Sequence, residues 1–238
     1  MKTKTYAVLT AALTIITLFP QCVHAEEGKS LKGIHKAYIS GYPDGSMRPE
    51  EYITREEAAS VFYRLLPKER QKKAMPFSDV PDGSWSFEAI ATLAGEGIIS
   101  GGDGLFRPKE RITRAEMAVM AAKFEGLKGG GKTFSDINGH WAEEYISAAV
   151  SNGWLAGYTN GEFKPDNSIT RAETMLLINN VLGRRPEGTN DLLEDMTTWT
   201  DNSDISNWYY LAVQEASNSH EYTRRDNGFE KWLAITKD

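Results

Sequence analysis

Apolar runs follow the same short polar quartet at three places along the chain. The quartet reads Thr-Arg-x-Glu, an isoleucine precedes it each time, and the residues after it have the apolar spacing of a helix. A Thr with a Glu three residues later is the pattern of a capping box, in which the Thr hydroxyl accepts from the N3 amide and the Glu side chain bonds back to the Thr amide. We therefore predict three capped helices, the first over residues 57–66. The quartets are residues 54–57, 113–116 and 170–173.

Helix capping leaves the arginine of each quartet unexplained. Arg55, Arg114 and Arg171 take the first helical position, where the helix dipole already presents about half a positive charge and acidic residues are preferred. A cation that recurs three times at an unfavourable position indicates a function. The alternative is a surface ion pair with a neighbouring acid, worth about 0–1 kcal/mol.

A second kind of segment alternates with the capped helices. Each begins with a tryptophan, after which apolar residues recur at i+4, i+5 and i+8, which predicts one buried face of a short helix. Phe-Ser-Asp precedes the first two tryptophans and Trp-Thr-Asp precedes the third. The tryptophans are Trp85, Trp141 and Trp208, and the equivalent aspartates are Asp79, Asp136 and Asp201.

Turn residues connect the two kinds of segment. A glycine preceded by Asp or Asn lies nine residues before each cap threonine, which predicts a turn. A proline lies five residues before the threonine, with a basic residue directly ahead of it. Proline disfavours helical conformation in the preceding residue, so we expect the three basic residues to be extended. They are Arg48, Arg107 and Lys164.

The count of half-units predicts a closed body. The first capped helix has no Trp-led segment before it, whereas the last Trp-led segment is followed only by Asn227-Gly228 and residues 235–238, which resemble a worn turn and helix cap. Three halves of each kind favour a pseudo-threefold arrangement in which the C-terminal part completes the first unit. We assign residues 1–25 to a signal peptide, 26–75 to the second half of repeat 1, 76–132 to repeat 2, 133–183 to repeat 3, 184–198 to a linker and 199–238 to the completing half-repeat.

The N-terminal residues have the pattern of a secretory signal peptide. Lys2 and Lys4 precede an apolar stretch over residues 6–19, and a small-residue cleavage site ends at Ala25. The stretch is too short to span a membrane as a helix, and no later one is longer. Cleavage would remove Cys22, the only cysteine, so stability must come from packing rather than disulfides. Lipidation of Cys22 is the alternative, although the residues before it match such a site poorly.

Charge and motif content exclude several function classes. The 238 residues carry a net charge of −6, which becomes −8 without the signal peptide because that segment holds two lysines and no acid. A net acidic chain argues against general binding to nucleic acid or anionic membranes, but it allows a local basic site. His35, His140 and His220 lack metal-ligand spacing, and no nucleophile motif is present. We therefore predict no metal, no cofactor and no catalysis.

The whole unit, repeated in order, resembles the S-layer homology domain. The resemblance rests on Phe-Ser-Asp, the Trp-led helix, Gly-Tyr-x-Asn-Gly-x-Phe-x-Pro at residues 157–165 and Ile-Thr-Arg-Ala-Glu at residues 112–116 and 169–173, and it covers nearly all of residues 32–238. It implies a mainly α fold, with three helix-loop-helix repeats in a pseudo-threefold spindle around a central helical bundle. It also implies a secreted, monomeric protein that attaches non-covalently to a pyruvylated secondary polymer of the Gram-positive cell wall.

The resemblance further implies that the polymer lies in grooves between repeats. Arg55, Arg114 and Arg171 would donate two-pronged hydrogen bonds to the pyruvate carboxylate, beside helix amides suited to anions. Two other sets could contact the sugar, with alternatives left open. The tryptophans could cover its apolar face, although packing is the favoured interpretation at the start of an amphipathic helix. The aspartates could accept from its hydroxyls or brace a loop.

Departures from the family pattern predict unequal grooves. Glu56 stands where the family usually has alanine and adds a negative charge beside Arg55, while Gly102 replaces the aromatic residue found at Tyr42 and Tyr158. Two other functions remain open with the same fold as a targeting device. One is a cell-wall-active enzyme, and the other is a subunit of a surface-layer lattice.

Overall fold

The computed structural model describes residues 31–70, 72–74 and 77–237, so the proposed signal peptide and Cys22 lie outside the described residues. Within them the chain forms helices that alternate with loops, and strands at both ends. The elements are β1 (Leu31–His35), α1 (Arg55–Leu65), α2 (Phe87–Gly95), α3 (Arg114–Phe124), α4 (Glu143–Ser151), α5 (Arg171–Leu182), the short 3-10 helix η1 (Thr189–Asp191), α6 (Tyr210–Ser217), β2 (His220–Arg224) and β3 (Glu230–Ile235).

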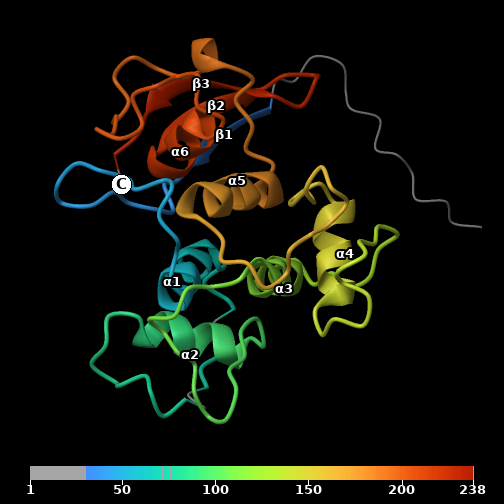
Figure 1. Ribbon diagram of the computed structural model, residues 1–238. Helices are drawn as coiled ribbons and strands as arrows, with labels where there is room; N and C mark the ends of the chain where they lie inside the picture. Colours follow the sequence, from blue (N-terminus) through green and yellow to red (C-terminus); the bar gives the residue numbers. More distant parts are fainter. Residues whose placement is uncertain (1–30, 71, 75–76, 238) are drawn as a thin grey trace, which may run out of the picture.

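The helices pack in pairs around a common centre. Helices α1, α3 and α5 lie toward the middle of the molecule, and α2, α4 and α6 lie outside them (Figure 1). Each inner helix contacts the next helix along the chain, α1 with α2, α3 with α4 and α5 with α6, and α3 also contacts α5. Small buried residues such as Ala118, Ala121 and Ala172 allow this close approach at the centre. The prediction of a mainly α fold is confirmed.

All three predicted capping boxes are present. In α3, Thr113 accepts from the Glu116 amide at 3.2 Å, and the Glu116 carboxylate accepts from the Thr113 amide at 2.9 Å. The same reciprocal pair opens α1 at Thr54 and α5 at Thr170. The quartet is therefore the start of each inner helix, which brings its arginine to the same place in every repeat.

A ring of backbone hydrogen bonds joins the three repeats just ahead of these caps. The amide of Ile112 donates to the carbonyl of Ile53 at 3.1 Å, that of Ile169 donates to Ile112 at 3.2 Å, and that of Ile53 donates to Ile169 at 3.3 Å. The three isoleucines are almost completely buried. Because the third bond returns to the first repeat, the arrangement closes with pseudo-threefold symmetry.

The basic residues before the prolines adopt a conformation that we did not predict. Arg48, Arg107 and Lys164 have φ between 54° and 59°, so they lie in the left-handed region and the expectation of extended backbone is wrong. Such residues cost about 1–3 kcal/mol unless their surroundings hold them in place. The hydrogen bonds that do so come from the three aspartates and are described with the site.

The C-terminal residues form strands rather than the degenerate helix cap that we predicted. Strand β2 pairs with β1 and β3 in an antiparallel sheet of order β1-β2-β3, with an irregularity in the β2–β3 register between Glu221 and Tyr222. A turn at Asn227-Gly228 does connect β2 to β3, with Gly228 at φ 83°. Ile235, expected to begin a cap, instead ends β3.

One glycine in each repeat admits an aromatic ring from the Trp-led half. A Cβ atom added at Gly41 would come within 2.1 Å of Trp199, and one at Gly157 within 2.1 Å of Phe134. At Gly101 it would lie 2.7 Å from Phe77 and 2.1 Å from the Leu105 carbonyl oxygen. Trp199, from the C-terminal segment, thus packs on the first repeat as the two phenylalanines pack on theirs.

We expect Gly101→Ala to lower the free energy of unfolding by about 1–3 kcal/mol, the usual cost of overpacking, because a carbonyl oxygen cannot move away as a side-chain end can. Urea unfolding measures the change. Gly131→Ala is the matched control, since a Cβ there meets no atom within 4 Å. Equal unfolding midpoints for the two variants would contradict the close packing inferred at Gly101.

Candidate ligand-binding grooves

Arg114 extends from the start of α3 into the following repeat. Its Nε donates to the Phe163 carbonyl at 3.0 Å and its Nη2 to the Ala156 carbonyl at 2.8 Å. Its Nη1 lies 3.6 Å from Oε1 of Glu173, the capping-box residue of α5. The residue is only 4% exposed. The arginine therefore joins two repeats, and Nη1 is the nitrogen without a carbonyl partner among the described residues.

The other two arginines repeat this arrangement around the ring. Each donates to two loop carbonyls of the next repeat and lies beside the capping-box glutamate at the start of that repeat's capped helix. The third repeat contacts the first in this way, so the three contacts form a closed ring. The alternative of an exposed surface ion pair does not fit, because Arg171 is 4% exposed and Arg55 is half-buried. Arg55 contacts Phe106, Ser100 and Glu116, and Arg171 contacts Met47, Ser40 and Glu57.

The amides at the helix starts already have partners. In α3 the Arg114 amide donates to the Asn167 carbonyl at 2.8 Å, and the Ala115 amide donates to the Pro165 carbonyl at 2.9 Å. The third amide, of Glu116, is taken by the cap threonine. The expectation that these helix termini bind the anion through their amides is therefore wrong, which leaves the guanidinium groups as the candidate donors.

The three aspartates bind loop backbone. Asp136 accepts from the amides of Phe163 at 2.9 Å and Lys164 at 2.7 Å, which holds Lys164 in its left-handed conformation. Asp79 does the same for Phe106 and Arg107, and Asp201 for Met47 and Arg48. Of the two open interpretations, the geometry favours bracing of the loop. Asp201 braces a loop that lies more than 150 residues earlier in the chain.

These bonds make the loop sensitive to acid. Desolvation raises the pKa of Asp136, but the amides of Phe163 and Lys164 outweigh it and hold the pKa below its usual value of 3.8. A carboxylate whose folded-state pKa is depressed stabilises the fold above its unfolded pKa and loses that contribution as the pH falls through the folded value. The contribution of Asp136 is therefore fully present at neutral pH, begins to fall near pH 3.8 and is lost as the pH drops through the lower folded-state pKa.

We expect Asp136→Asn to lower the free energy of unfolding at pH 7 by about 1.5–3 kcal/mol, since the substitution removes the charge and replaces one acceptor oxygen with an NH₂ group that cannot accept from a loop amide. Urea unfolding at pH 7 and pH 3 measures it, and the gap between variant and wild type should shrink at the lower pH. Asp82→Asn, at an exposed position, is the control. A gap of the same size at both pH values would show that the carboxylate charge is not responsible.

The three tryptophans are exposed rather than packed. Trp85, Trp141 and Trp208 are 60%, 63% and 60% exposed, so packing, our favoured interpretation, is wrong. Each lies two residues before its helix, which starts at Phe87, Glu143 or Tyr210, and the helix face therefore does not extend to the indole. Exposed indoles at equivalent positions remain available to a ligand.

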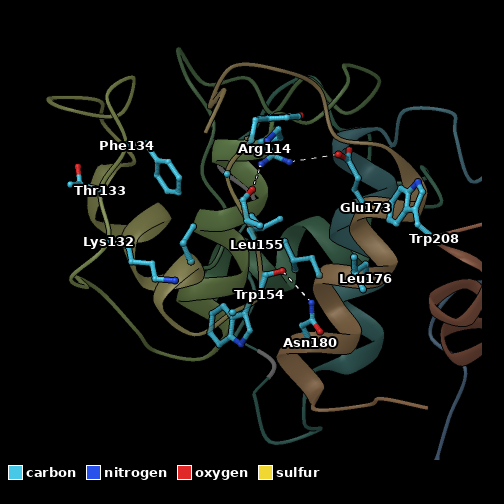
Figure 2. Close-up of a pocket in the computed structure, with 16 residues that line it drawn as sticks. Arg114, Lys132, Thr133, Phe134, Trp154, Leu155, Glu173, Leu176, Asn180 and Trp208 are labelled. Carbon is cyan, nitrogen blue, oxygen red and sulfur yellow. Dashed lines mark hydrogen bonds and ion pairs between the residues drawn. The ribbon is translucent and has the colours of Figure 1, made fainter. Parts of the chain in front are cut away.

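Three hollows lie at equivalent places between repeats, and they differ greatly in size. The one at Arg114 and Glu173 has a volume of about 700 Å³, the one at Arg171 about 140 Å³ and the one at Arg55 about 50 Å³. In the largest, Lys132 and Trp208 lie on opposite sides of the opening, with Arg114 and Glu173 between α3 and α5 (Figure 2). We call this hollow the α3–α5 groove.

The equivalent tyrosines of two hollows make similar contacts. Tyr42 and Tyr158 each lie 5.0 Å from the arginine of their hollow, Arg171 or Arg114. At the 140 Å³ hollow the Tyr42 hydroxyl also donates to Glu57 at 3.2 Å. Glu56 is buried and bonds to Ser86 and Lys109, so its charge is engaged away from Arg55.

Several lining residues were not predicted as site residues. Lys132 ends a glycine-rich segment, and the pattern around Glu173 indicates only a capping box. Leu176 lies six residues after the cap threonine and is 39% exposed, on a helix face that also carries the partly exposed Glu173 and Asn180. The sequence does show Leu176 as an apolar residue outside the helical spacing of the buried face. The position of Lys132, in contrast, depends on how the chain folds.

Comparison with known proteins agrees with this architecture. A sequence model of the S-layer homology domain matches residues 33–59, 76–118 and 133–175. "Cell surface glycoprotein 1" of Acetivibrio thermocellus is 36% identical over 227 residues, 88% of this chain and 10% of that protein. "Cellulosome-anchoring protein" of the same organism is 35% identical over 83% of this chain and 46% of that protein. "S-layer protein EA1" of Bacillus anthracis is 33% identical over 65% of this chain and 19% of that protein.

The chain thus spans less than half the length of each of these relatives. Another match carries the name of an enzyme, an endoglucanase, so membership alone does not separate anchoring from catalysis. Among the helices of the described residues, none combines the length and apolar character that crossing a membrane requires. The three matched segments, the repeated capped helices and the relatives together establish that this chain belongs to the family of proteins that carry S-layer homology domains.

Proposed function

We propose that this protein anchors non-covalently to the cell wall by binding an acidic secondary polymer. A pyruvylated amino sugar of that polymer would occupy the α3–α5 groove. The observation that carries the proposal is the groove itself. It is about 700 Å³ in volume and combines a buried arginine, a lysine, a tyrosine and an exposed tryptophan. The relatives named for cell-surface, anchoring and S-layer roles support localisation at the cell surface.

Charge favours this groove over the hollow at Arg55, and volume favours it over both other hollows. Arg114 and Lys132 against Glu173 leave one net positive charge in a chain of net charge −6. The hollow at Arg55 pairs one arginine with one glutamate and is too small for a sugar ring. The hollow at Arg171 also has Arg64, but its volume is about one fifth of that of the α3–α5 groove.

The ligand carboxylate would bind Arg114 at the nitrogen that faces the groove. Nη1 is 3.6 Å from Glu173, longer than a hydrogen bond, whereas Nε and Nη2 are held by carbonyls that fix the plane of the guanidinium. A carboxylate reaching Nη1 would form a charge-assisted hydrogen bond with little loss of side-chain entropy. The Trp208 indole at the rim offers an apolar surface to the sugar ring.

Sedimentation with purified cell walls tests the proposal. We expect the protein to be retained on walls that carry pyruvate and released from walls from which pyruvate has been removed chemically. Protein that stays in solution with both preparations contradicts wall anchoring, and equal retention on both contradicts recognition of the carboxylate. Soluble sugar released during the incubation would support the alternative of a wall-active enzyme.

A further inference from the structure

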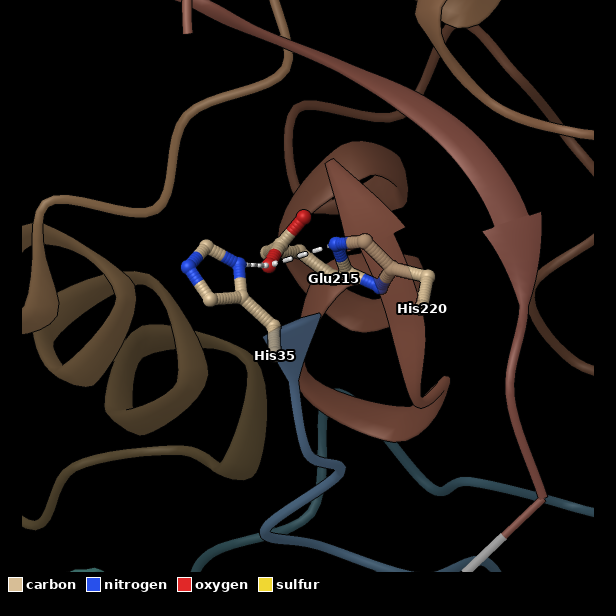
Figure 3. A group of neighbouring side chains, drawn as sticks. All are labelled: His35, Glu215 and His220. Atoms are coloured by element: carbon tan, nitrogen blue, oxygen red, sulfur yellow. Dashed lines mark hydrogen bonds and ion pairs between the residues drawn. The ribbon is translucent and has the colours of Figure 1, made fainter. Parts of the chain in front are cut away.

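A group of buried, metal-ligating side chains lies away from the grooves, where the two ends of the described chain meet. His35 ends β1, His220 begins β2 opposite it in the sheet, and Glu215 comes from α6 (Figure 3). One ligand atom from each lies within 4.8 Å of the others. His35 Nδ1 is 3.0 Å and His220 Nε2 is 3.5 Å from the same oxygen, Glu215 Oε1.

Neighbouring groups fix which atoms face the centre. His220 Nδ1 lies 2.9 Å from the Asn218 carbonyl, which requires a proton on Nδ1 and leaves Nε2 with its lone pair. Glu215 Oε2 accepts from the Trp232 indole at 2.9 Å, and Oε1 lies 3.0 Å from His35 Nδ1. Within the described residues, the buried Nε2 of His220 makes no hydrogen bond. The lone pair of Nε2 and the acceptor Oε1 thus lie 3.5 Å apart with no proton on His220 to join them.

A positive charge between these acceptors would remove their repulsion. A metal ion can supply this charge, because it binds the neutral imidazole and the ionised carboxylate. Glu230 adds a second buried carboxylate, with Oε2 3.7 Å from His35 Nδ1, and Arg224 pairs with its other oxygen at 3.2 Å.

We propose that His35 Nδ1, Glu215 Oε1 and His220 Nε2 bind a divalent first-row transition-metal ion, with zinc as the best match. Two imidazoles and one carboxylate form a donor set that zinc uses, and ligands about 2.0–2.2 Å from a tetrahedral ion lie about 3.4 Å apart, close to the observed 3.0 and 3.5 Å. Hydrogen bonds from Trp232 and to Asn218 orient two of the ligands, as the outer partners of metal sites do.

The consequence of binding is a link between distant segments. His35 and Glu215 are 180 residues apart, so the ion would join the N-terminal strand to the helix and hairpin that complete the ring. An ion that binds only the folded state raises stability by mass action.

Metal titration of the full chain without a histidine tag tests the site. After treatment with a chelator, we expect Co²⁺ to give the visible absorption of a site with nitrogen ligands, and Zn²⁺ to displace it with one ion per chain. Zn²⁺ should also raise the thermal unfolding midpoint. His220→Gln and Glu215→Gln should each weaken binding by more than the roughly 10–100-fold lost with an outer partner.

The control is His140→Asn, which changes a histidine that pairs with exposed Asp166 outside the group. It should bind Co²⁺ and Zn²⁺ as the wild type does. Comparing the zinc-induced shift of the midpoint within each variant removes any direct effect of the substitution on folding. The proposal is overturned if the wild type gives no Co²⁺ spectrum, or if His220→Gln and Glu215→Gln bind the metal as tightly as the wild type. The three side chains would then be a buried hydrogen-bonded core. Wall retention is a separate assay and is unaffected by either result.

Discussion

Arg114→Ala is expected to lower the free energy of unfolding by about 3 kcal/mol. The substitution leaves the Phe163 and Ala156 carbonyls without their donor, and each buried group left unsatisfied costs about 1–3 kcal/mol. It also removes the cation beside Glu173. Urea unfolding, followed by the far-UV circular dichroism of the helices, measures the loss.

The control for this prediction is Lys128→Ala. Lys128 forms an exposed ion pair with Glu144 at 2.6 Å, and such pairs contribute only about 0–1 kcal/mol. If Arg114→Ala costs no more than Lys128→Ala, the arginine does not join the repeats as its contacts indicate. Because Arg114 serves the fold as well as the groove, its alanine variant cannot test ligand binding by itself.

Trp208→Ala is expected to weaken binding to cell walls by about 30-fold. Tryptophan is enriched among interface residues whose truncation costs 2 kcal/mol or more, and each 1.4 kcal/mol corresponds to about tenfold in affinity. The exposed indole contributes little to the fold, so the free energy of unfolding should stay within about 0.5 kcal/mol of the wild type. Quantitative sedimentation with walls at several protein concentrations measures the affinity.

Trp85→Ala is a closely matched control. Trp85 starts the equivalent half-unit and is equally exposed at 60%, but it does not line the α3–α5 groove. Its alanine variant should bind walls like the wild type. Equal losses from both variants would indicate a general role of surface aromatic residues, and no loss from either would exclude Trp208 as a ligand contact.

Local interactions were predictable from the sequence. The capping box needs only residues three apart, so the starts of α1, α3 and α5 follow from the quartets. The buried faces of the outer helices also followed from spacing, as at Ile90 and Leu93. The closed arrangement could also be predicted, because that prediction needs only the number of half-units of each kind and not the contacts between them.

Interactions between repeats were not predictable in the same way. The carbonyls that hold Arg114 come from residues 42 and 49 positions later, and no local pattern marks them. The left-handed conformation of Lys164 depends on Asp136, 28 residues away, which overrides the local preference of a residue before proline. The C-terminal strands were misjudged because β3 is completed by pairing with β2, and β2 by pairing with β1 from the other end.

The indole N–H signals of the tryptophans provide the most direct test of the central claim, that an acidic wall polymer occupies the α3–α5 groove. The six tryptophans can be assigned by single substitutions and followed by ¹H–¹⁵N NMR while a pyruvylated wall fragment is added. We predict that the Trp208 signal moves in a saturable way, that the Trp85 signal stays in place, and that the same fragment without pyruvate moves neither. Equal movement of Trp85 and Trp208, or movement of Trp208 that does not depend on pyruvate, would contradict it.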